Sequence, residues 1–217
     1  MAIRHIKFSE KWRPIRAFAV VALVAGATSL GATAWANDCA AVDIVVARGT
    51  GEPGWLGSVV GDPLYGELAQ ALPVDSTANA VIYPADLRVA SSAADGTADM
   101  VDHLVRQSAD CPDQRFVLVG YSQGAAVVHG VLGTALVAGI PGVHTLPVYA
   151  ESKVAAVLLF GDPLRALGWD VPDLYRWRTG NYCAGGDPIC GAGIDMRAHT
   201  DYGWAIRPAA WFAVAHL

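Results

Sequence analysis

The sequence predicts an α/β protein in which a central, mostly parallel, five-stranded sheet is covered by helices on both faces. Strand-like apolar runs alternate along the chain with stretches whose apolar residues recur at helical spacing, a pattern typical of parallel strands joined by crossover helices. One run, Val154–Phe160, is apolar without interruption, as expected for a strand buried on both faces. No Pro/Ser-rich linker, internal repeat or low-complexity tract divides the chain into further domains.

The expected elements follow one another in regular order. Strands are expected at Val42–Ala47, Ala80–Tyr83, Phe116–Val119, Val154–Phe160 and Tyr175–Arg178. Helices are expected at Pro63–Leu72, Ala98–Ser108, Gln123–Val137 and Pro208–His216. Because ligands of open parallel sheets bind beyond the carboxyl ends of the strands, residues that directly follow these runs are candidates for a functional site.

The first 36 residues are expected to be a secretory signal rather than part of the folded domain. Five basic residues precede an apolar stretch from Ala17 to Leu30, and Ala34-Trp35-Ala36 has the small-x-small pattern at which signal peptidase cuts. An uncleaved anchor is the alternative, because the apolar stretch could extend to Ala36 and approach the about twenty residues that a spanning helix needs. Cleavage would leave residues 37–217 as one exported domain without a stable membrane span, either released or kept at the envelope.

Without its first 36 residues the chain is strongly acidic. Ten basic and nineteen acidic residues remain, a net charge of −9, and Lys153 is the only lysine among them. Such a surface repels phosphate backbones and anionic lipid headgroups, which argues against nucleic acid as a partner and against electrostatic docking on membranes. A neutral substrate suits this charge better.

All four cysteines, Cys39, Cys111, Cys183 and Cys190, lie after the predicted signal. An even number of cysteines in an exported chain predicts two disulfides. Sequence alone does not choose among the three possible pairings, although Cys183 and Cys190 are close enough for a local bridge. A zinc site is the alternative, but no two cysteines have the C-x-x-C spacing, so no metal is expected.

A candidate nucleophile follows the third predicted strand. The pentapeptide Gly120-Tyr121-Ser122-Gln123-Gly124 comes after Phe116–Val119 and before a helical stretch, which is the setting of a nucleophile elbow. Small residues two before and two after Ser122 let the backbone pass close beneath an exposed hydroxyl. Since a glycine-rich chain can contain this pentapeptide by chance, the flanking strand and helix carry much of the argument.

A serine nucleophile needs a histidine base and an acid that orients the histidine. In α/β-hydrolases these follow the serine in the order acid, then histidine. His129 lies on the helix next to the nucleophile, His144 precedes every suitable acid, and His216 is at the chain end. His199 is therefore the candidate base. Asp187 is the favoured acid because a Cys183–Cys190 bridge would hold its loop; the other candidate acids are Asp162, Asp170, Asp173, Asp195 and Asp201.

Ester hydrolysis also needs hydrogen-bond donors for an oxyanion. The amide of Gln123 follows the nucleophile directly, and Thr50 can offer its amide and hydroxyl from the loop Arg48–Glu52 after the first strand. A nucleotide phosphate is the alternative ligand of that loop. The loop lacks the P-loop lysine and the third glycine of a dinucleotide-binding turn, however, so the residues favour a serine hydrolase without a cofactor.

Five stretches of the chain together resemble one family: Ala47–Glu52, Gly120–Ala125, Leu159–Pro163, Cys183–Cys190 and His199–Tyr202. They are similar to the cutinase family, in particular to cutinase-like proteins of mycobacteria and related actinobacteria, over nearly all of residues 37–217. The resemblance implies a small lidless α/β-hydrolase with the disulfides Cys39–Cys111 and Cys183–Cys190. It further implies these roles: Ser122 as nucleophile, Asp187 as acid, His199 as base, and Thr50 and Gln123 as oxyanion donors.

The resemblance implies a secreted esterase, and the residues near the predicted site refine its substrate. Fungal cutinases frame the site with apolar loops, whereas here Asp195 and Arg197 interrupt the apolar residues Ile194 and Met196, which could still contact an acyl chain. We therefore expect a monomer that hydrolyses soluble esters of short to medium acyl chains better than cutin polymer. A phospholipase, thioesterase or polysaccharide acetyl esterase stays open, as does a weakly active envelope protein that serves for binding or as an antigen.

Overall fold

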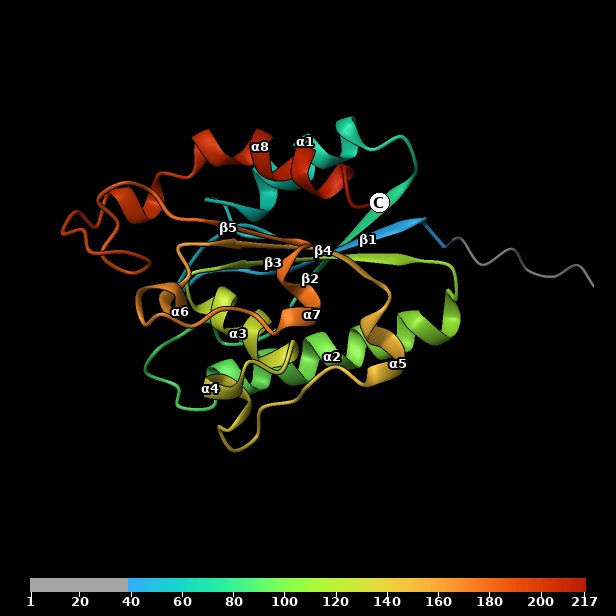
Figure 1. Ribbon diagram of the computed structural model, residues 1–217, viewed down its shortest axis with the longest axis horizontal. Coiled ribbons are helices and arrows are strands. Elements are labelled where there is room, and N and C mark those ends of the chain that lie inside the picture. The colour runs from blue at the N-terminus through green and yellow to red at the C-terminus, as the bar shows by residue number, and fades with distance from the viewer. Residues whose placement is uncertain (1–38) are drawn as a thin grey trace, which may run out of the picture. The chain divides into compact units, whose positions relative to one another are not determined.

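The computed structural model describes residues 39–217, which form an α/β fold around one five-stranded sheet. The predicted signal, residues 1–36, lies outside the described residues. The strands are β1 (Val42–Ala47), β2 (Ser76–Ala80), β3 (Arg115–Tyr121), β4 (Val154–Phe160) and β5 (Thr179–Tyr182). All neighbouring strands are parallel and their order is β2-β1-β3-β4-β5, so their carboxyl ends meet at one edge of the sheet (Figure 1).

Helices cover both faces of this sheet. The longer ones within residues 39–217 are α1 (Gly61–Ala71), α2 (Ser92–Asp110), α3 (Gln123–Val131) and α8 (Gly203–Val214). α1 and α8 lie together on one face, and α2 and α3 lie on the other (Figure 1). The connections contain single-turn helices: α4 (Ala135–Ala138), α5 (Val148–Glu151), α6 (Pro163–Ala166), α7 (Asp173–Arg176) and the 3-10 turn η1 (Ala198–Thr200).

The sheet is buried on both faces, as its apolar strands predict. Val157 and Leu159 of β4 belong to the hydrophobic cluster beneath α2 and α3. Leu158 and Phe160 belong to the cluster beneath α1 and α8. Burying a large apolar side chain in this way contributes about 1.5–3 kcal/mol relative to leaving it exposed. Because successive side chains of β4 point to opposite faces, this strand stabilises the packing of both helical layers on the sheet.

The two edge strands differ from the expectation. The run Tyr175–Arg178 is wrong as a strand, because α7 ends at Arg176 and β5 begins only at Thr179. The helical turn begins after Pro172, and the Arg178 amide donates to the Tyr175 carbonyl at 3.0 Å; a short apolar run does not distinguish such a turn from a strand. β2 precedes its expected position because its small and polar residues give no apolar pattern.

The helices also have different bounds from those expected: α1 is shifted by one or two residues, and α2 begins at Ser92, six residues before its expected start. The predicted helix Gln123–Val137 is interrupted, since α3 ends at Val131 and Gly133 has a φ of 81°. The break turns the chain so that the Thr134 Oγ1 lies 2.8 Å from the His129 Nδ1. The last helix begins at Gly203, before the expected start at Pro208, which lies inside it.

Two disulfides restrain the described part of the chain, one near its start and one within a loop. Cys39–Cys111 joins the segment before β1 to the residue after α2, and Cys183–Cys190 closes a loop after β5. In the chain-entropy account these bonds stabilise the fold by about 4 and about 2.5 kcal/mol. The second bond matters most for the site, because it encloses Asp187.

Every tryptophan in the described part of the chain is exposed. Trp55, Trp169, Trp177, Trp204 and Trp211 have relative exposures between 42% and 68%. Tryptophan is on average a well-buried residue, so this core is built from aliphatic, phenylalanine and tyrosine side chains instead.

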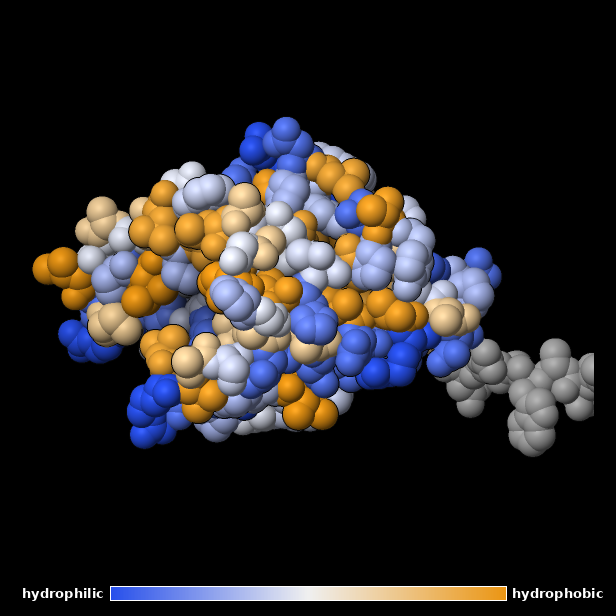
Figure 2. All heavy atoms as spheres, turned by 90° about the horizontal axis from the view of Figure 1, so that it is seen from below, coloured by the Kyte–Doolittle hydropathy of each residue, from blue (hydrophilic) through white to orange (hydrophobic). Residues whose placement is uncertain are grey.

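Apolar side chains also reach the surface. Seen from below, many of them gather at the left end of the molecule (Figure 2), which is the end that the carboxyl ends of the strands face in Figure 1. Among residues 39–217 no helix combines the length and apolarity needed to cross a membrane.

Candidate active site

Ser122 lies in the turn between β3 and α3, in a backbone conformation that few residues adopt. Its φ is 54° and its ψ is −116°, a positive φ that costs a non-glycine residue about 1–3 kcal/mol. The turn is held by the Ser122 amide, which donates to the Phe160 carbonyl at 2.9 Å. Gly124 makes the close approach possible, because a Cβ there would lie 1.9 Å from the Ala47 carbonyl oxygen. The strained turn therefore presents Ser122 at the carboxyl edge of the sheet.

Ser122 is hydrogen-bonded to His199, far away in the sequence. The Ser122 Oγ and the His199 Nε2 are 2.9 Å apart. Tyr121 fixes the imidazole from a second side, since its ring centroid lies 5.2 Å from that of His199. Its hydroxyl also donates to the His199 carbonyl at 2.6 Å. The histidine is thus oriented through both its ring and its backbone.

The other imidazole nitrogen faces a buried carboxylate. The His199 Nδ1 lies 2.8 Å from the Asp187 Oδ2, which also accepts from the Tyr202 hydroxyl at 2.6 Å, while the Ile189 amide donates to the Oδ1 at 2.7 Å. Burial by itself raises the pKa of Asp187, but the hydrogen bonds outweigh it and the net pKa is lowered. Asp187 is therefore ionised at neutral pH. We call Ser122–His199–Asp187 the open row.

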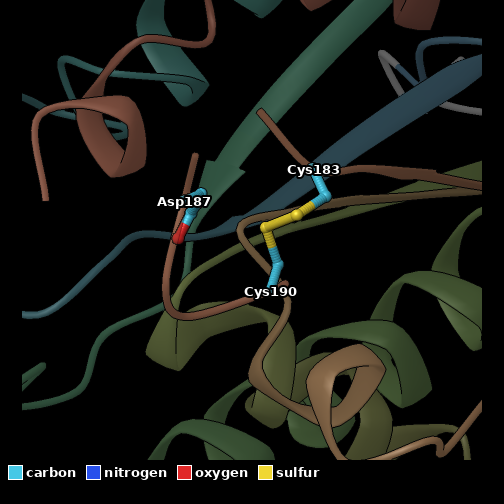
Figure 3. Close-up of side chains that lie close together, drawn as sticks. All are labelled: Cys183, Asp187 and Cys190. Atoms are coloured by element: carbon cyan, nitrogen blue, oxygen red, sulfur yellow. A yellow bond between two sulfur atoms is a disulfide. The ribbon is translucent and has the colours of Figure 1, made fainter. Parts of the chain in front are cut away.

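The Cys183–Cys190 disulfide closes the loop that carries Asp187 (Figure 3). The two sulfurs and a carboxylate oxygen of Asp187 lie within 4.8 Å of one another. Because the sulfurs are bonded to each other, neither is the thiolate that a metal ligand must be. The cluster therefore restrains the loop rather than forming a metal centre.

The loop after β1 brings Thr50 next to Gln123, with 3.4 Å between the Thr50 Oγ1 and the Gln123 Oε1. Glu52 holds this loop by accepting from the Gly49 amide at 2.6 Å and the Val59 amide at 2.7 Å. Burial is the main reason that the pKa of Glu52 is raised. Since Gln123 is the first residue of α3, its amide has no partner within the helix. Two residues thus offer donors beside Ser122.

A pocket of about 310 Å³ opens over the open row. It is lined by Thr50, Leu87, Tyr121, Ser122, Ile189, Met196, His199 and Thr200. Of the two predicted acyl-chain contacts, Met196 lines the pocket, whereas Ile194 does not and is 97% exposed. Sequence reasoning missed Leu87 and Ile189. Ile189 could have been found from its place inside the Cys183–Cys190 loop, but Leu87 lies in a loop without any recognisable pattern.

The other histidines considered as bases have different surroundings. His129 is buried, with its Nε2 3.0 Å from the Asp162 Oδ2. His144 is exposed. The His216 Nδ1 lies 2.7 Å from the Phe212 carbonyl oxygen. Of the histidines downstream of Ser122, the structure brings His199 to it.

The parallel sheet with helices on both faces, together with Ser122 in its strained turn after a central strand, defines a small α/β-hydrolase. The chain belongs to the cutinase family, whose model matches residues 38–217. It is 36% identical over 205 residues to phospholipase Culp4 of Mycobacterium tuberculosis, covering 89% of each chain. It is 35% identical over 181 residues to a cutinase of Botryotinia fuckeliana, covering 82% of this chain and 83% of the relative.

A solved structure agrees with this assignment. The Trichoderma reesei cutinase in complex with a phosphonate inhibitor superimposes with a TM-score of 0.68 at 32% identity, covering 82% of this chain and 76% of that one. The protein is accordingly a carboxylic ester hydrolase.

Proposed function

We propose that the protein is a secreted serine esterase that hydrolyses carboxylic esters of short to medium acyl chains through a Ser122–His199–Asp187 triad. The observation that carries this proposal is the continuous hydrogen-bonded row, with 2.9 Å from serine to imidazole and 2.8 Å from imidazole to carboxylate. A serine hydroxyl is a weak nucleophile by itself, and the row supplies both the base and the group that orients it.

The reaction proceeds in two steps. In the first, the Ser122 Oγ attacks the ester carbonyl carbon while the His199 Nε2 takes its proton, and ionised Asp187 stabilises the resulting imidazolium. His199 then gives that proton to the alkoxide, which leaves as the alcohol and an acyl-Ser122 ester remains. In the second step His199 takes a proton from water, whose oxygen attacks the acyl carbon. The proton returns to the Ser122 Oγ as the carboxylic acid leaves.

In each tetrahedral intermediate, hydrogen-bond donors from Gln123 and Thr50 stabilise the negative charge on the oxyanion. Gln123 contributes its backbone amide, and Thr50 its amide and hydroxyl. The N-terminus of α3 and the Glu52 hydrogen bonds hold these donors in place before substrate arrives, which is what makes such stabilisation effective. Neither step requires a metal or a cofactor.

The pocket supports soluble esters of limited chain length as substrates. Leu87, Ile189 and Met196 offer apolar contacts next to Ser122. Asp195 and Arg197 lie close by in the sequence, are exposed and form an ion pair at 3.5 Å, which places charge where a continuous polyester surface would have to dock. Cutin polymer is therefore expected to react more slowly than a medium-chain soluble ester.

Export as a monomer is part of the proposal. Two disulfides fit an oxidising compartment, and residues 1–36 supply a signal whose expected cleavage site follows Ala36. N-terminal sequencing of protein from the culture medium and from the envelope fraction tests the cleavage site and the location together. Light scattering on the purified protein tests the monomer.

The first experiment is hydrolysis of p-nitrophenyl esters, from acetate to palmitate, by residues 37–217 beside folded Ser122→Ala. Activity should peak at a short to medium chain length and disappear in the variant. If folded Ser122→Ala retained wild-type activity, the proposed nucleophile would be wrong. If cutin polymer were cleaved faster than the best soluble ester, the proposed substrate class would be wrong.

Phospholipase activity is the second candidate, because the relative Culp4 is named a phospholipase and matches 89% of this chain. The net charge of −9 for residues 37–217 favours zwitterionic over anionic lipid. Fatty acid release from phosphatidylcholine vesicles, compared at equal enzyme concentration with p-nitrophenyl butyrate hydrolysis, decides between the candidates.

A further inference from the structure

A second Asp–His–hydroxyl arrangement lies inside the domain, away from the pocket. The Asp162 Oδ2 is 3.0 Å from the His129 Nε2, and the His129 Nδ1 is 2.8 Å from the Thr134 Oγ1. All three side chains are buried. We call Asp162–His129–Thr134 the buried row. Asp162 comes from the Leu159–Pro163 stretch, to which the reaction steps assign no role.

The Asp162 carboxylate is hydrogen-bonded to three elements, α3, β5 and α6. Its Oδ2 accepts from His129 of α3 and, at 2.8 Å, from the Asn181 Nδ2 of β5. Its Oδ1 accepts from the Leu164 amide of α6 at 2.9 Å. Burial raises the pKa of Asp162, but these hydrogen bonds and the nearby His129 outweigh it and the net pKa is lowered. The group is therefore a buried, ionised anchor.

The turn that Asp162 anchors contacts both reacting residues of the open row. The Phe160 carbonyl accepts from the Ser122 amide at 2.9 Å. Gly161, with a φ of 55°, lies against the imidazole, because a Cβ there would be 2.7 Å from the His199 Cε1 and 3.0 Å from its Nδ1. The Gly161 amide donates to the Tyr182 carbonyl of β5 at 3.1 Å. Phe160 and Gly161 thus contact both Ser122 and His199, and we call this pair of residues the floor.

We propose that Asp162 is a positioning residue for the esterase reaction: its carboxylate fixes the Phe160–Gly161 floor and thereby sets the separation of the Ser122 hydroxyl and the His199 imidazole. The inference rests on the proposed roles of Ser122 and His199. Asp162 itself touches neither the substrate pocket nor the reacting atoms. It acts by linking α3, which begins directly after Ser122, to the turn that supports His199.

Asp162→Asn removes the anchor with little change of volume. Both carboxylate oxygens of Asp162 face donors, so either orientation of the asparagine amide points an NH₂ group at a donor. An NH₂ at the Oδ1 position faces the Leu164 amide and one at the Oδ2 position faces the Asn181 Nδ2, so at least one hydrogen bond is replaced by a repulsive contact and the turn must shift. A displacement of about 1 Å at a catalytic group can reduce the rate about 100-fold.

Asp43→Asn is a matched control. Asp43 is also buried, and its carboxylate contacts the His103 Nε2 at 2.6 Å and the Thr77 Oγ1 at 3.1 Å. It lies near the start of β1, at the opposite edge of the sheet from the open row. Both variants therefore lose a buried carboxylate that is paired with a histidine. Asp162→Asn also affects the floor next to the open row, whereas Asp43→Asn does not.

The test measures kcat and KM for p-nitrophenyl butyrate at a temperature at which circular dichroism shows both variants folded. The kcat of Asp162→Asn should fall about 10- to 100-fold with KM within about threefold, while the kcat of Asp43→Asn stays within about twofold of wild type. A wild-type kcat in folded Asp162→Asn would overturn the proposal. Equal losses of kcat in both variants would overturn it too, since they would indicate general loosening.

A reactive alkyl p-nitrophenyl phosphonate separates this inference from the proposed function. Mass spectrometry locates the label, and its rate of attachment reports how reactive Ser122 is. Labelling of Ser122 that slows in Asp162→Asn in proportion to kcat supports positioning, whereas an unchanged labelling rate refutes positioning and leaves the triad intact. A label on another residue of the wild type refutes both.

Asn181→Ala keeps the proposal testable if Asp162→Asn does not fold. Asn181 is half-buried at the edge of the sheet, and its removal deletes one of the donors to Asp162 without uncovering an unpaired charge. The kcat should fall, but by less than in Asp162→Asn, because the carboxylate keeps its contacts with His129 and Leu164. An unchanged kcat in the folded variant would overturn the proposal.

Discussion

The open row and the buried row have nearly the same spacing, and both contain a buried carboxylate, but they differ in whether a pocket reaches them. The open row measures 2.8 Å from carboxylate to imidazole and 2.9 Å from imidazole to hydroxyl. The buried row measures 3.0 and 2.8 Å. The carboxylate binds the Nδ1 in the open row and the Nε2 in the buried row. The open row meets a pocket, whereas the histidine and aspartate side chains of the buried row have no exposed surface.

The comparison shows that hydrogen-bond distances alone do not make an active site. What distinguishes the open row is a serine in a strained turn, neighbouring donors from Thr50 and Gln123, and space for a substrate. Thr134 has an ordinary negative φ of −59° and is almost fully buried. The same three chemical groups can therefore have different roles, and the role that we propose is reaction for the open row and support for the buried row.

The largest expected contrast is between the two histidines. His199→Ala should reduce kcat by about 10⁴-fold or more, as loss of a triad base does elsewhere, with a small change in melting temperature. His129→Ala should reduce activity far less and stability far more. Activity and thermal unfolding are measured on both proteins, and a His199→Ala enzyme within 100-fold of wild type would remove the open row from the mechanism.

The second prediction concerns the stability of the buried row. His129→Leu leaves the Asp162 carboxylate buried without its partner, which should cost about 3–5 kcal/mol and lower the melting temperature by about 10 °C. Each carboxylate keeps two other donors, but His199→Leu should cost less, because His199 lines the pocket and water can replace part of the lost interaction, whereas His129 is fully buried. Urea denaturation gives both free energies of unfolding. Equal losses in the two variants would show that burial does not distinguish the rows.

The third prediction uses the disulfide beside the open row. Replacing Cys183 and Cys190 by serine should cost about 2.5 kcal/mol of stability and, at temperatures where the protein is folded, should also reduce kcat because the Asp187 loop is no longer closed. The control replaces Cys39 and Cys111, where about 4 kcal/mol is lost but folded protein should retain its kcat. Retained kcat in both double variants would mean that the local bond does not hold Asp187.

The smallest expected effect is the change in folding stability at low pH. The pKa of Asp162 is lowered in the folded protein from an ordinary value of 3.8, so its stabilising contribution is complete above that value and is lost as the pH falls through the folded value. Asp162→Asn should therefore be less stable than wild type at pH 7, and the difference should shrink below about pH 4. Urea midpoints from pH 7 to pH 2.5 test this, and a constant difference would contradict it.

The open row was accessible to sequence reasoning, and the buried row was not. Ser122 lies in a recognisable pentapeptide, His199 is left after elimination of other histidines, and Asp187 lies between two cysteines. Nothing in the sequence links His129 to Asp162, because their contact depends on how α3 packs against the turn after β4. His129, set aside as a base because it lies on the helix next to the nucleophile, is a core residue with two partners.

The fold shows the same division between local pattern and tertiary contact. The bounds of β1 and β4 agree with the expectation because both strands are buried along their whole length and are apolar apart from Asp43 of β1. β2 and β5 lie at the sheet edges and contain polar or small residues, so their sequences carry little strand signal. The supporting tyrosines, Tyr121 and Tyr202, could not be assigned beforehand, since each acts through a residue distant in the sequence.

The exposed tryptophans determine what fluorescence can report on this protein. In residues 37–217 all five indoles, those of Trp55, Trp169, Trp177, Trp204 and Trp211, are already substantially in contact with water in the native state. Unfolding should therefore shift their emission little, and acrylamide should quench the folded protein strongly. Far-ultraviolet circular dichroism suits the stability measurements better. A change in indole emission would instead report that another molecule has bound over one or more of these exposed tryptophans.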